Sequence, residues 1–370
     1  MKILVTGGAG FIGSHLVDRL LSEGHAIRIL DNFEAQVHEG NRPAYLNPDA
    51  EYLQGDVRDR DCLRRALEGV EVVFHEAACV GVGQSMYQIE KYVSANVLGT
   101  AILLDCIVND RIPLKKLIVA SSMSIYGEGQ YLCAGCGVIY PSLRALDQLK
   151  ERKWEMHCHR CGSIAKPQPT PETKPLVPTS VYAVSKRDQE ELCLSVGRSY
   201  HIPTVALRYF NVYGPRQSLS NPYTGVCAIF SARIKNHRPP LIFEDGLQTR
   251  DFIHVRDIVQ ANVLVMQNPQ ADYETFNVGT GQALPIVQIA RLLSELYEIP
   301  QVPEISSKYR AGDIRHCYAD VSKLTALGFR PSVSLSDGLR ELVGWGRQIN
   351  AQDRVEEAAK ELQVRGLAQG

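Results

Sequence analysis

The glycine-rich turn after the first apolar run constrains this chain more than any other feature. Ile3-Leu4-Val5 reads as a strand, and Thr6-Gly7-Gly8-Ala9-Gly10-Phe11-Ile12-Gly13 follows it directly, ahead of a helical pattern. Glycines at this spacing permit a tight turn, close approach of an anion to the backbone, and close packing of the helix on the strand. The order strand, turn, helix therefore predicts a dinucleotide site, with the pyrophosphate at the helix N-terminus. The residues expected there are Gly7, Gly10, Phe11, Ile12 and Gly13.

Apolar runs and helical patterns alternate through the first part of the chain. The runs are Ile3–Val5, Ala26–Leu30, Val70–Phe74 and Lys116–Ala120, and another begins at Val205. Buried runs separated by helices predict an α/β fold with a Rossmann-type, doubly wound parallel sheet.

Breaks in this alternation suggest the domain organisation. We expect an NAD-binding domain over 1–127 and 171–211, an insertion over 128–170, and a smaller, mainly substrate-binding C-terminal lobe over 212–345. The charged last segment, 346–370, is expected to form a helical extension.

Composition excludes several classes of protein. The 370 residues include 40 basic and 41 acidic side chains, which argues against nucleic-acid binding by bulk charge. No apolar run reaches the ~18 residues of a membrane span, and the N-terminus lacks a signal-peptide pattern, so we expect a cytoplasmic protein without membrane contact. Ten cysteines in so long a chain are too sparse for a disulfide scaffold.

Acidic residues after the strands favour NAD as the dinucleotide. Asp31 and Asn32 end the second run, where a carboxylate accepts hydrogen bonds from the adenosine ribose and repels a 2′-phosphate. Asp56 and Val57 follow the next strand and are expected to hold the adenine, and Ala77 completes the predicted cofactor set.

A tyrosine and a lysine share one helical face. Tyr182 and Lys186 are spaced i, i+4, and Ser122 ends the strand that begins at Lys116. The lysine charge lowers the pKa of a neighbouring phenol and also holds the nicotinamide ribose, so Tyr182 is the predicted acid/base.

With these motifs, the chain resembles the extended short-chain dehydrogenase/reductase family, in particular its NAD-dependent nucleotide-sugar epimerases and dehydratases. The resemblance runs from Met1 to about residue 345, and it implies that Ser122, Tyr182 and Lys186 are catalytic. It also implies a nucleotide-diphosphate sugar as substrate and a homodimer built on the helices near 96–106 and 182–196, which carry Leu98, Leu103, Leu192 and Leu194. The residues expected at the sugar nucleotide are Val80, Ser124, Asn211, Arg216, Asn221, Arg250, Arg310 and Asp313. Among them, Arg250 and Arg310 match arginines that hold the diphosphate in this family.

The residues after Ser122 narrow the reaction. In this family, the 4,6-dehydratases carry an Asp-Glu pair where this chain has Met123 and Ser124, and neither side chain can eliminate water. The remaining groups suit a 4-epimerase that oxidises C4 transiently to a 4-keto sugar.

Two cysteine pairs distinguish the insertion. Cys133-x-x-Cys136-Gly and Cys158-x-x-Cys161-Gly are separated by 21 residues, a pattern typical of a tetrahedral zinc site. Four thiolates leave no open coordination position, so the zinc is expected to be structural, in a knuckle that lacks its own core.

The insertion and the segments around Val80 and Ser122 resemble one bacterial subgroup, the dTDP-L-rhamnose 4-epimerases, which form dTDP-6-deoxy-L-talose. Val80 stands where UDP-galactose 4-epimerases often have lysine, which weakens the case for UDP-galactose as substrate. The alternatives are an epimerase of UDP-hexoses or UDP-hexuronates, or a non-catalytic NAD-binding scaffold.

Overall fold

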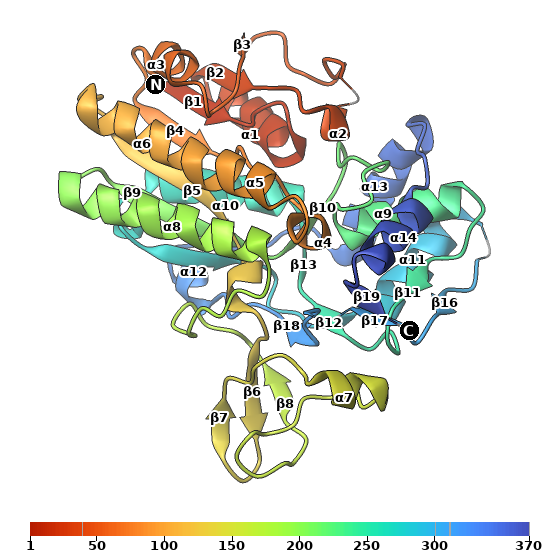
Figure 1. Cartoon of the computed structure of the whole chain (residues 1–370). Helices are drawn as coiled ribbons and strands as arrows, with labels where there is room; N and C mark the ends of the chain where they lie inside the picture. Colours follow the sequence, from red (N-terminus) through yellow and green to blue (C-terminus); the bar gives the residue numbers. More distant parts are fainter. Residues whose placement is uncertain (39, 300, 311, 370) are drawn as a thin grey trace.

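A parallel sheet forms the centre of the molecule (Figure 1). The computed structural model describes residues 1–38, 40–299, 301–310 and 312–369, and across these the central sheet has seven strands, all parallel. In sheet order they are β14 (Thr275–Val278), β9 (Thr204–Tyr209), β5 (Lys116–Ser122), β4 (Val72–His75), β1 (Lys2–Thr6), β2 (Ala26–Asp31) and β3 (Glu51–Gln54). The order reverses between β1 and β4, which confirms the doubly wound sheet expected from the sequence.

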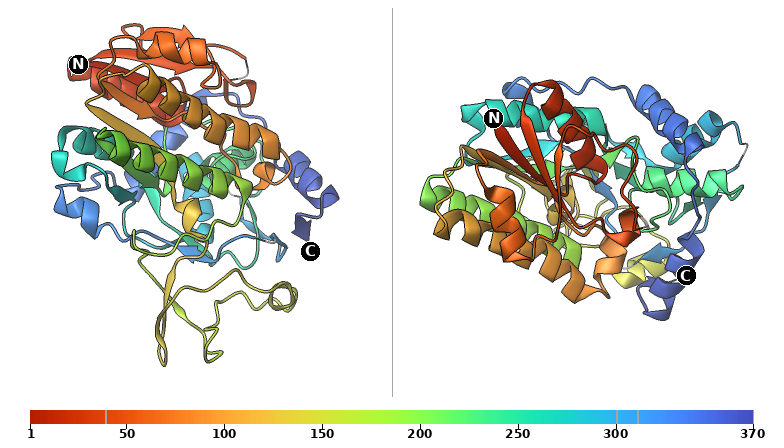
Figure 2. Two further views of the ribbon diagram at one scale, coloured as in Figure 1. Left: turned by 60° about the vertical axis from the view of Figure 1, so that its left-hand side comes forward. Right: turned by 90° about the horizontal axis from the view of Figure 1, so that it is seen from above.

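Helices cover both faces of this sheet, as the view from above shows (Figure 2). One face packs on α1 (Phe11–Ser22), α10 (Val255–Gln267) and α12 (Ser322–Ala326). The other packs on α3 (Arg60–Leu67), α6 (Gly99–Asn109) and α8 (Val181–Tyr200). All seven residues of β5 are buried, as expected for a strand covered on both sides.

The segment 212–345 contributes to two bodies, the NAD-binding domain around the central sheet and a smaller C-terminal lobe. Its strand β14 joins the central sheet by pairing with β9, and its helices α10 and α12 pack on that sheet. Its other helices, α9 (Val226–Lys235), α11 (Ile286–Tyr297) and α13 (Leu335–Gln348), bury a separate apolar cluster. Short strands surround them: β10 (Asn211–Tyr213), β11 (Leu241–Ile242), β12 (Thr249–Arg250), β13 (Phe252–His254), β15 (Leu284–Pro285), β16 (Glu304–Ile305), β17 (Tyr309–Arg310) and β18 (His316–Cys317).

The insertion is an antiparallel sheet that projects from the rest of the molecule near β12 and β18 (Figure 1). Its elements are β6 (Gln130–Cys133), β7 (Gly137–Ile139), β8 (Lys166–Gln168) and the short helix α7 (Leu146–Lys150). Contrary to expectation it has a small core, in which Tyr131, Ile139 and Met156 pack with Cys133 and Cys158.

The C-terminal extension packs back onto earlier parts of the chain. Helix α14 (Val355–Val364) is followed by β19 (Ala368–Gln369), which pairs antiparallel with β17. The remaining short elements are α2 (Ala35–His38), α4 (Val82–Ser85), η2 (Met123–Tyr126) and η3 (Pro269–Ala271).

One helical run is unusually apolar. The elements α5 (Ile89–Tyr92), η1 (Val93–Leu98) and α6 form a continuous run over Ile89–Asn109 that could cross a membrane by length and composition alone. It packs against α8 and α3, and 44% of its most apolar window is buried. Its α6 part contributes to the apolar cluster on one face of the sheet. Of the leucines expected at a dimer interface, Leu103 and Leu194 are buried in this core, whereas Leu98 is half exposed.

Candidate active site

Packing explains the glycines of the first turn. Gly7 has φ +69°, and a Cβ there would lie 2.8 Å from the backbone of Ala77. A Cβ on Gly13 would lie 2.4 Å from the Gly7 carbonyl oxygen. At Gly10, which precedes α1, the described residues provide no side-chain cap. The backbone amides of Phe11 and Ile12 therefore lie in a helix start suited to a pyrophosphate.

Asp31, the last residue of β2, forms hydrogen bonds with the glycine-rich turn. Its Oδ2 accepts a hydrogen bond from the Ala9 amide at 3.0 Å, and its Oδ1 accepts one from the Phe33 amide at 2.8 Å. Burial raises the pKa of this carboxyl, and the two amides oppose that rise. Each oxygen keeps a second lone pair, so the carboxylate can still accept from ribose hydroxyls.

The predicted adenine residues lie together beyond β2 and β3. The Asn32 amide donates to Asp56 Oδ2 at 3.0 Å, and a hydrogen bond from Arg58 lowers the pKa of Asp56 to about 2. Val57 is buried against Gly99, where an added Cβ would lie 2.6 Å from the valine.

The structure brings Ser122, Tyr182 and Lys186 together. Ser122 ends β5, and its hydrogen bond with Tyr182 partly opposes the burial that raises the phenol pKa. One turn along α8, Lys186 Nζ donates to the Ala120 carbonyl at 2.7 Å and to Gln189 Oε1 at 2.9 Å. Burial lowers the pKa of Lys186 to about 8. Two donated protons leave a third for a ribose hydroxyl beside the phenol.

Two supporting residues escaped the sequence analysis. Ser85 Oγ accepts the Tyr182 amide at 3.0 Å. Asn96, fully buried in the π-helical segment η1, donates to Ser185 Oγ at 2.9 Å and to the Cys79 carbonyl at 3.0 Å. The only signal in the sequence is an asparagine inside an apolar helical run, where a polar side chain needs a buried partner.

The residues expected at the sugar come from both the NAD-binding domain and the C-terminal lobe. Ser124 Oγ donates to Ser122 Oγ at 2.9 Å, and Val80 is exposed. Asn211 Oδ1 is buried and finds no hydrogen-bond partner within the described part of the chain, as expected of a group that awaits a ligand. Asn221 is also buried, and its Oδ1 accepts from Gln36 Nε2 at 3.1 Å.

The arginines expected at the diphosphate have different surroundings. Arg250 donates to the carbonyls of Ile314 and Arg315 at 2.7 and 3.0 Å. Arg310 stacks on the Phe243 ring at 4.2 Å, and its buried Nε has no hydrogen-bond partner among the described residues. An unpaired guanidinium donor of this kind fits a phosphate oxygen.

Arg216 and Asp313, also expected at the sugar nucleotide, both contact other parts of the protein. Arg216 pairs with Asp18 of α1 at 2.7 Å and stacks on Tyr45, so these contacts are with the NAD-binding domain. The Asp313 carbonyl accepts a hydrogen bond from Arg144 of the insertion.

Comparison with known proteins identifies the relatives of this site. Residues 3–135 and 144–279 match the model of the NAD dependent epimerase/dehydratase family. The chain belongs to this family. The gap in the match falls inside the cysteine insertion.

Individual epimerases of the family align over nearly the whole chain. A dTDP-L-rhamnose 4-epimerase of Burkholderia thailandensis is 36% identical over 348 residues, which cover 93% of this chain and 94% of the relative. The crystal structure of a Thermotoga maritima UDP-glucose 4-epimerase with UDP-glucose is similar with a TM-score of 0.77 and 32% identity, covering 94% of this chain and 99% of that one. A Bacillus cereus UDP-glucuronic acid 4-epimerase, solved with UDP-glucuronic acid and NAD, gives 0.75 and 29%, with coverage of 95% and 100%.

These similarities confirm two expectations from the sequence. The chain is an NAD-dependent enzyme of the nucleotide-sugar epimerase family, and the alternative of a non-catalytic scaffold is set aside. The relatives act on different sugars, so they do not fix the substrate of this epimerase.

The four cysteines of the insertion lie together. Their sulfur atoms are all within 4.8 Å of one another, and Cys133 Sγ lies 3.4 Å from Cys161 Sγ. Sulfur atoms on a tetrahedral zinc ion at about 2.3 Å are about 3.8 Å apart, so this arrangement fits the ion. Hydrogen bonds from Ser163 lower the pKa of the Cys161 thiol to about 6, whereas the hydrogen bond with Cys161 raises the pKa of Cys136 to about 12.

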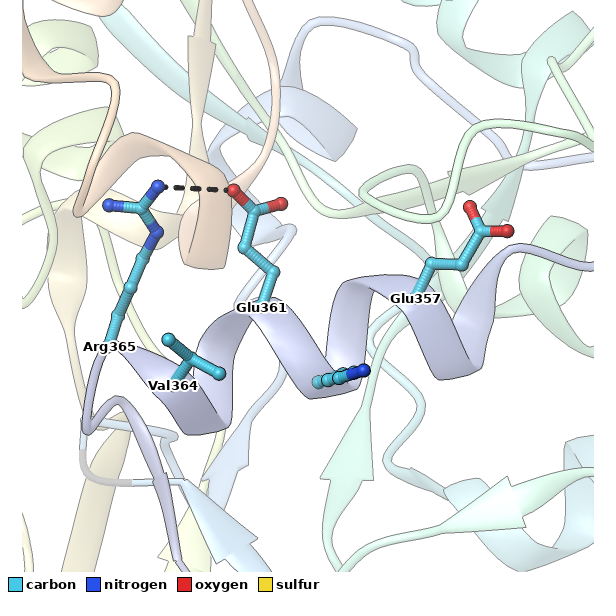
Figure 3. Close-up of a pocket in the computed structure, with 5 residues that line it drawn as sticks. Glu357, Glu361, Val364 and Arg365 are labelled. Carbon is cyan, nitrogen blue, oxygen red and sulfur yellow. Dashed lines mark hydrogen bonds and ion pairs between the residues drawn. The ribbon is translucent and has the colours of Figure 1, made fainter.

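The C-terminal helix α14 bridges the two bodies of the epimerase. Glu361 accepts hydrogen bonds from Tyr87 at 3.0 Å and from Tyr223 at 3.3 Å. Figure 3 shows Glu361 beside Arg365, which also stacks on Tyr87. Among the described residues, those that line the pocket in this view belong to α14 and its C-terminal end, and none of them is a proposed catalytic residue.

Proposed function

We propose that this enzyme is a nucleotide-sugar 4-epimerase that inverts C4 through a transient 4-keto sugar. The observation that carries the proposal is the cluster of Ser122, Tyr182 and Lys186 with Met123 and Ser124 beside it. This cluster can move a proton to and from one carbinol oxygen, but positions 123 and 124 lack the carboxyl groups that water elimination requires.

Each residue has a defined task in that reaction. NAD, when bound at the glycine-rich turn, supplies the acceptor and donor of hydride. Tyr182 removes the proton from the C4 hydroxyl and later returns it, while Ser122 hydrogen-bonds to the same oxygen. Lys186 holds the ribose and keeps positive charge near the phenolate. Inversion also requires the keto sugar to turn in the site before C4 is reduced.

The proposed substrate is dTDP-L-rhamnose and the product dTDP-6-deoxy-L-talose. The 36% identity with the Burkholderia thailandensis enzyme and the apolar, exposed Val80 support this choice. A UDP-hexose or UDP-hexuronate is the second candidate, since solved relatives carry UDP-glucose and UDP-glucuronic acid.

A substrate panel tests both candidates. The purified protein is incubated with dTDP-, UDP- and GDP-sugars, and the products are followed by NMR. We expect a 4-epimer from dTDP-L-rhamnose. A 4-epimer from UDP-sugars alone would select the second candidate, and the absence of any epimer would contradict the proposed reaction.

We further propose that the four cysteines bind one structural zinc ion per chain. The close sulfur atoms and the soft thiolate ligands support zinc, and four sulfurs leave no position for substrate. Elemental analysis of protein purified without chelators tests this: about one zinc per chain is expected, and Cys161→Ser should lose it. A zinc-free wild-type protein would contradict the proposal.

Two further parts of the proposal concern the whole protein. We propose a cytoplasmic enzyme, consistent with ten cysteines that are not in disulfides, and a homodimer formed through the helical run Ile89–Asn109 and α8. Exposed apolar side chains on these helices support the dimer: Ile89, Val93, Leu98 and Val184.

A further inference from the structure

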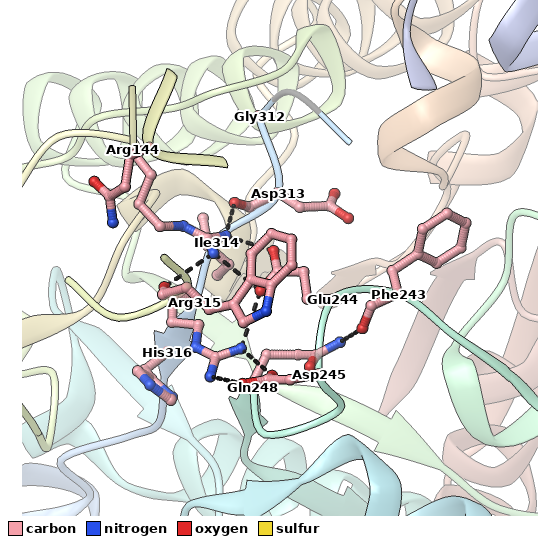
Figure 4. A network of polar contacts seen from close by, with 12 residues as sticks. Arg144, Phe243, Glu244, Asp245, Gln248, Gly312, Asp313, Ile314, Arg315 and His316 are labelled. Carbon is pink, nitrogen blue, oxygen red and sulfur yellow. Dashed lines mark hydrogen bonds and ion pairs between the residues drawn. The ribbon is translucent and has the colours of Figure 1, made fainter. Parts of the chain in front are cut away.

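Ion pairs around two buried arginines join the insertion to the rest of the epimerase (Figure 4), with Glu155 and Asp245 at the partly exposed edge of the group. The Arg315 side chain is fully buried, and its guanidinium lies 2.6 Å from Glu155, 2.7 Å from Asp245 and 3.0 Å from Glu244. Arg144 lies 2.7 Å from the same Glu244. These five residues, Arg144, Glu155, Glu244, Asp245 and Arg315, form what we call the arginine network.

Three separate segments meet in the arginine network. Arg144 and Glu155 come from the insertion, Glu244 and Asp245 follow β11, and Arg315 precedes β18. Glu155 is three residues from Cys158, one of the clustered cysteines. The network therefore connects the proposed zinc site to two segments of the substrate lobe.

The same segments place the arginines expected at the diphosphate. Arg250 is held by the carbonyl oxygens of Ile314 and Arg315, so its position depends on the backbone that Arg315 anchors. Arg310 stacks on Phe243, the residue before Glu244. Displacement of the network would move both guanidinium groups.

A second contact from the insertion fixes this backbone. The Glu128 carboxylate accepts hydrogen bonds from the amides of Arg315 at 2.5 Å and His316 at 3.3 Å, and from the Tyr131 hydroxyl at 2.9 Å. Tyr131 packs in the core of the insertion with Cys133 and Cys158. The insertion thus contacts the segment before β18 at two places, through Glu155 and through Glu128.

We propose that Glu155 is a positioning residue through which the metal-loaded insertion sets the diphosphate-binding arginines Arg250 and Arg310. This inference rests on the proposed function, because it assigns the arginines to a nucleoside diphosphate. Glu155 itself does not touch the substrate. Its carboxylate fixes Arg315, and Arg315 fixes the carbonyl oxygens that hold Arg250.

Glu155→Gln tests the link, and Glu151→Gln is the matched control. Glu151 is an exposed residue of the same insertion that pairs with Lys153. Binding of dTDP and UDP to the NAD-loaded protein is measured by calorimetry, together with kcat, KM and zinc content. We expect Glu155→Gln to raise the Kd of the nucleoside diphosphate and the KM of the nucleotide sugar about tenfold, since residues that carry coupling contribute on this scale. We expect kcat and zinc content to stay within about twofold of wild type, because neither Tyr182 nor a cysteine has changed.

Loss of metal should act through the same contact. Cys161→Ser is expected to raise the Kd of dTDP as Glu155→Gln does. The double variant should bind dTDP no more weakly than Cys161→Ser alone, because the effects of two residues that act in series on the Kd do not add. An unchanged Kd in Glu155→Gln, an equal rise in Glu151→Gln, or additive effects in the double variant would overturn the inference while leaving the proposed function intact. A wild-type protein that binds neither dTDP nor UDP would overturn both.

Discussion

Burial shifts the pKa values of Tyr182 and Lys186, the titratable side chains nearest to the proposed reaction. Burial raises the pKa of Tyr182, where the sequence led us to expect that Lys186 lowers it, and burial lowers the pKa of Lys186 to about 8. Oxidised nicotinamide, when bound, would add positive charge near the phenol and so lower its pKa. The site is therefore built to release the phenol proton when cofactor is bound.

Tyr182→Phe tests this role. The variant keeps the ring but loses the acid/base, so kcat should fall at least ~10²-fold, the usual contribution of such a group. Tyr200→Phe, at the exposed end of the same helix, should keep wild-type kcat. A Tyr182→Phe variant with near-normal kcat would remove this residue from the mechanism.

His75 makes the fold sensitive to acid. It is fully buried between Thr6 and Thr100, and burial lowers its pKa from 6.5 to about 3. Between these values the unfolded chain binds a proton that the folded chain does not, so the stability contributed by His75 is present above pH 6.5 and is lost as the pH falls.

A buried-histidine variant measures that loss. Relative to His75→Gln, wild type should lose about 2 kcal/mol more free energy of unfolding between pH 7 and pH 5, at about 1.4 kcal/mol per pH unit below 6.5. Urea unfolding at both pH values gives the comparison, with exposed His201→Asn as control. Equal pH dependence in wild type and His75→Gln would show that His75 is not the group responsible.

Among the elements, the C-terminal extension has the clearest structural role. Helix α14 contacts Tyr87 and Tyr223, and β19 pairs with β17, the strand that carries Arg310. The extension therefore holds the strand that carries Arg310, at the edge of the proposed diphosphate site.

Removal of residues 355–370 tests this role. The truncated protein should keep kcat but show a KM for nucleotide sugar raised about fivefold, because Arg310 is no longer held in place before binding. Val364→Ser, an exposed change on the same helix, should leave KM unaltered. A truncated enzyme with wild-type KM would contradict the assignment.

The sequence predicts local elements of this site well and long-range ones poorly. The glycine turn, the Tyr182–Lys186 face and the close cysteines follow from short spacings with one physical meaning. The arginine network does not, because Arg144, Glu244 and Arg315 meet only through the fold and each reads as an ordinary surface charge. Leu103 and Leu194 show the same limit, since apolar helical positions suit a core and an interface equally.

At the scale of the whole molecule, the proposed dimer explains the exposed apolar helices. Leu98→Glu places a charge on that face and should shift a dimer toward monomer at micromolar concentration, as measured by light scattering. Ile164→Glu, on the exposed surface of the insertion, is the control and should stay dimeric. A monomeric wild-type protein would contradict the dimer.

The fate of the hydrogen at C4 tests the proposed epimerisation most directly. The enzyme is incubated in ordinary water with dTDP-L-rhamnose that carries deuterium at C4, and the product is examined by NMR and mass spectrometry. Because hydride leaves C4 and returns to it within one cycle, the 4-epimer should retain the deuterium, with no net NADH formed. An epimer that has exchanged its deuterium for solvent hydrogen, or stoichiometric NADH with a released keto sugar, would contradict the mechanism.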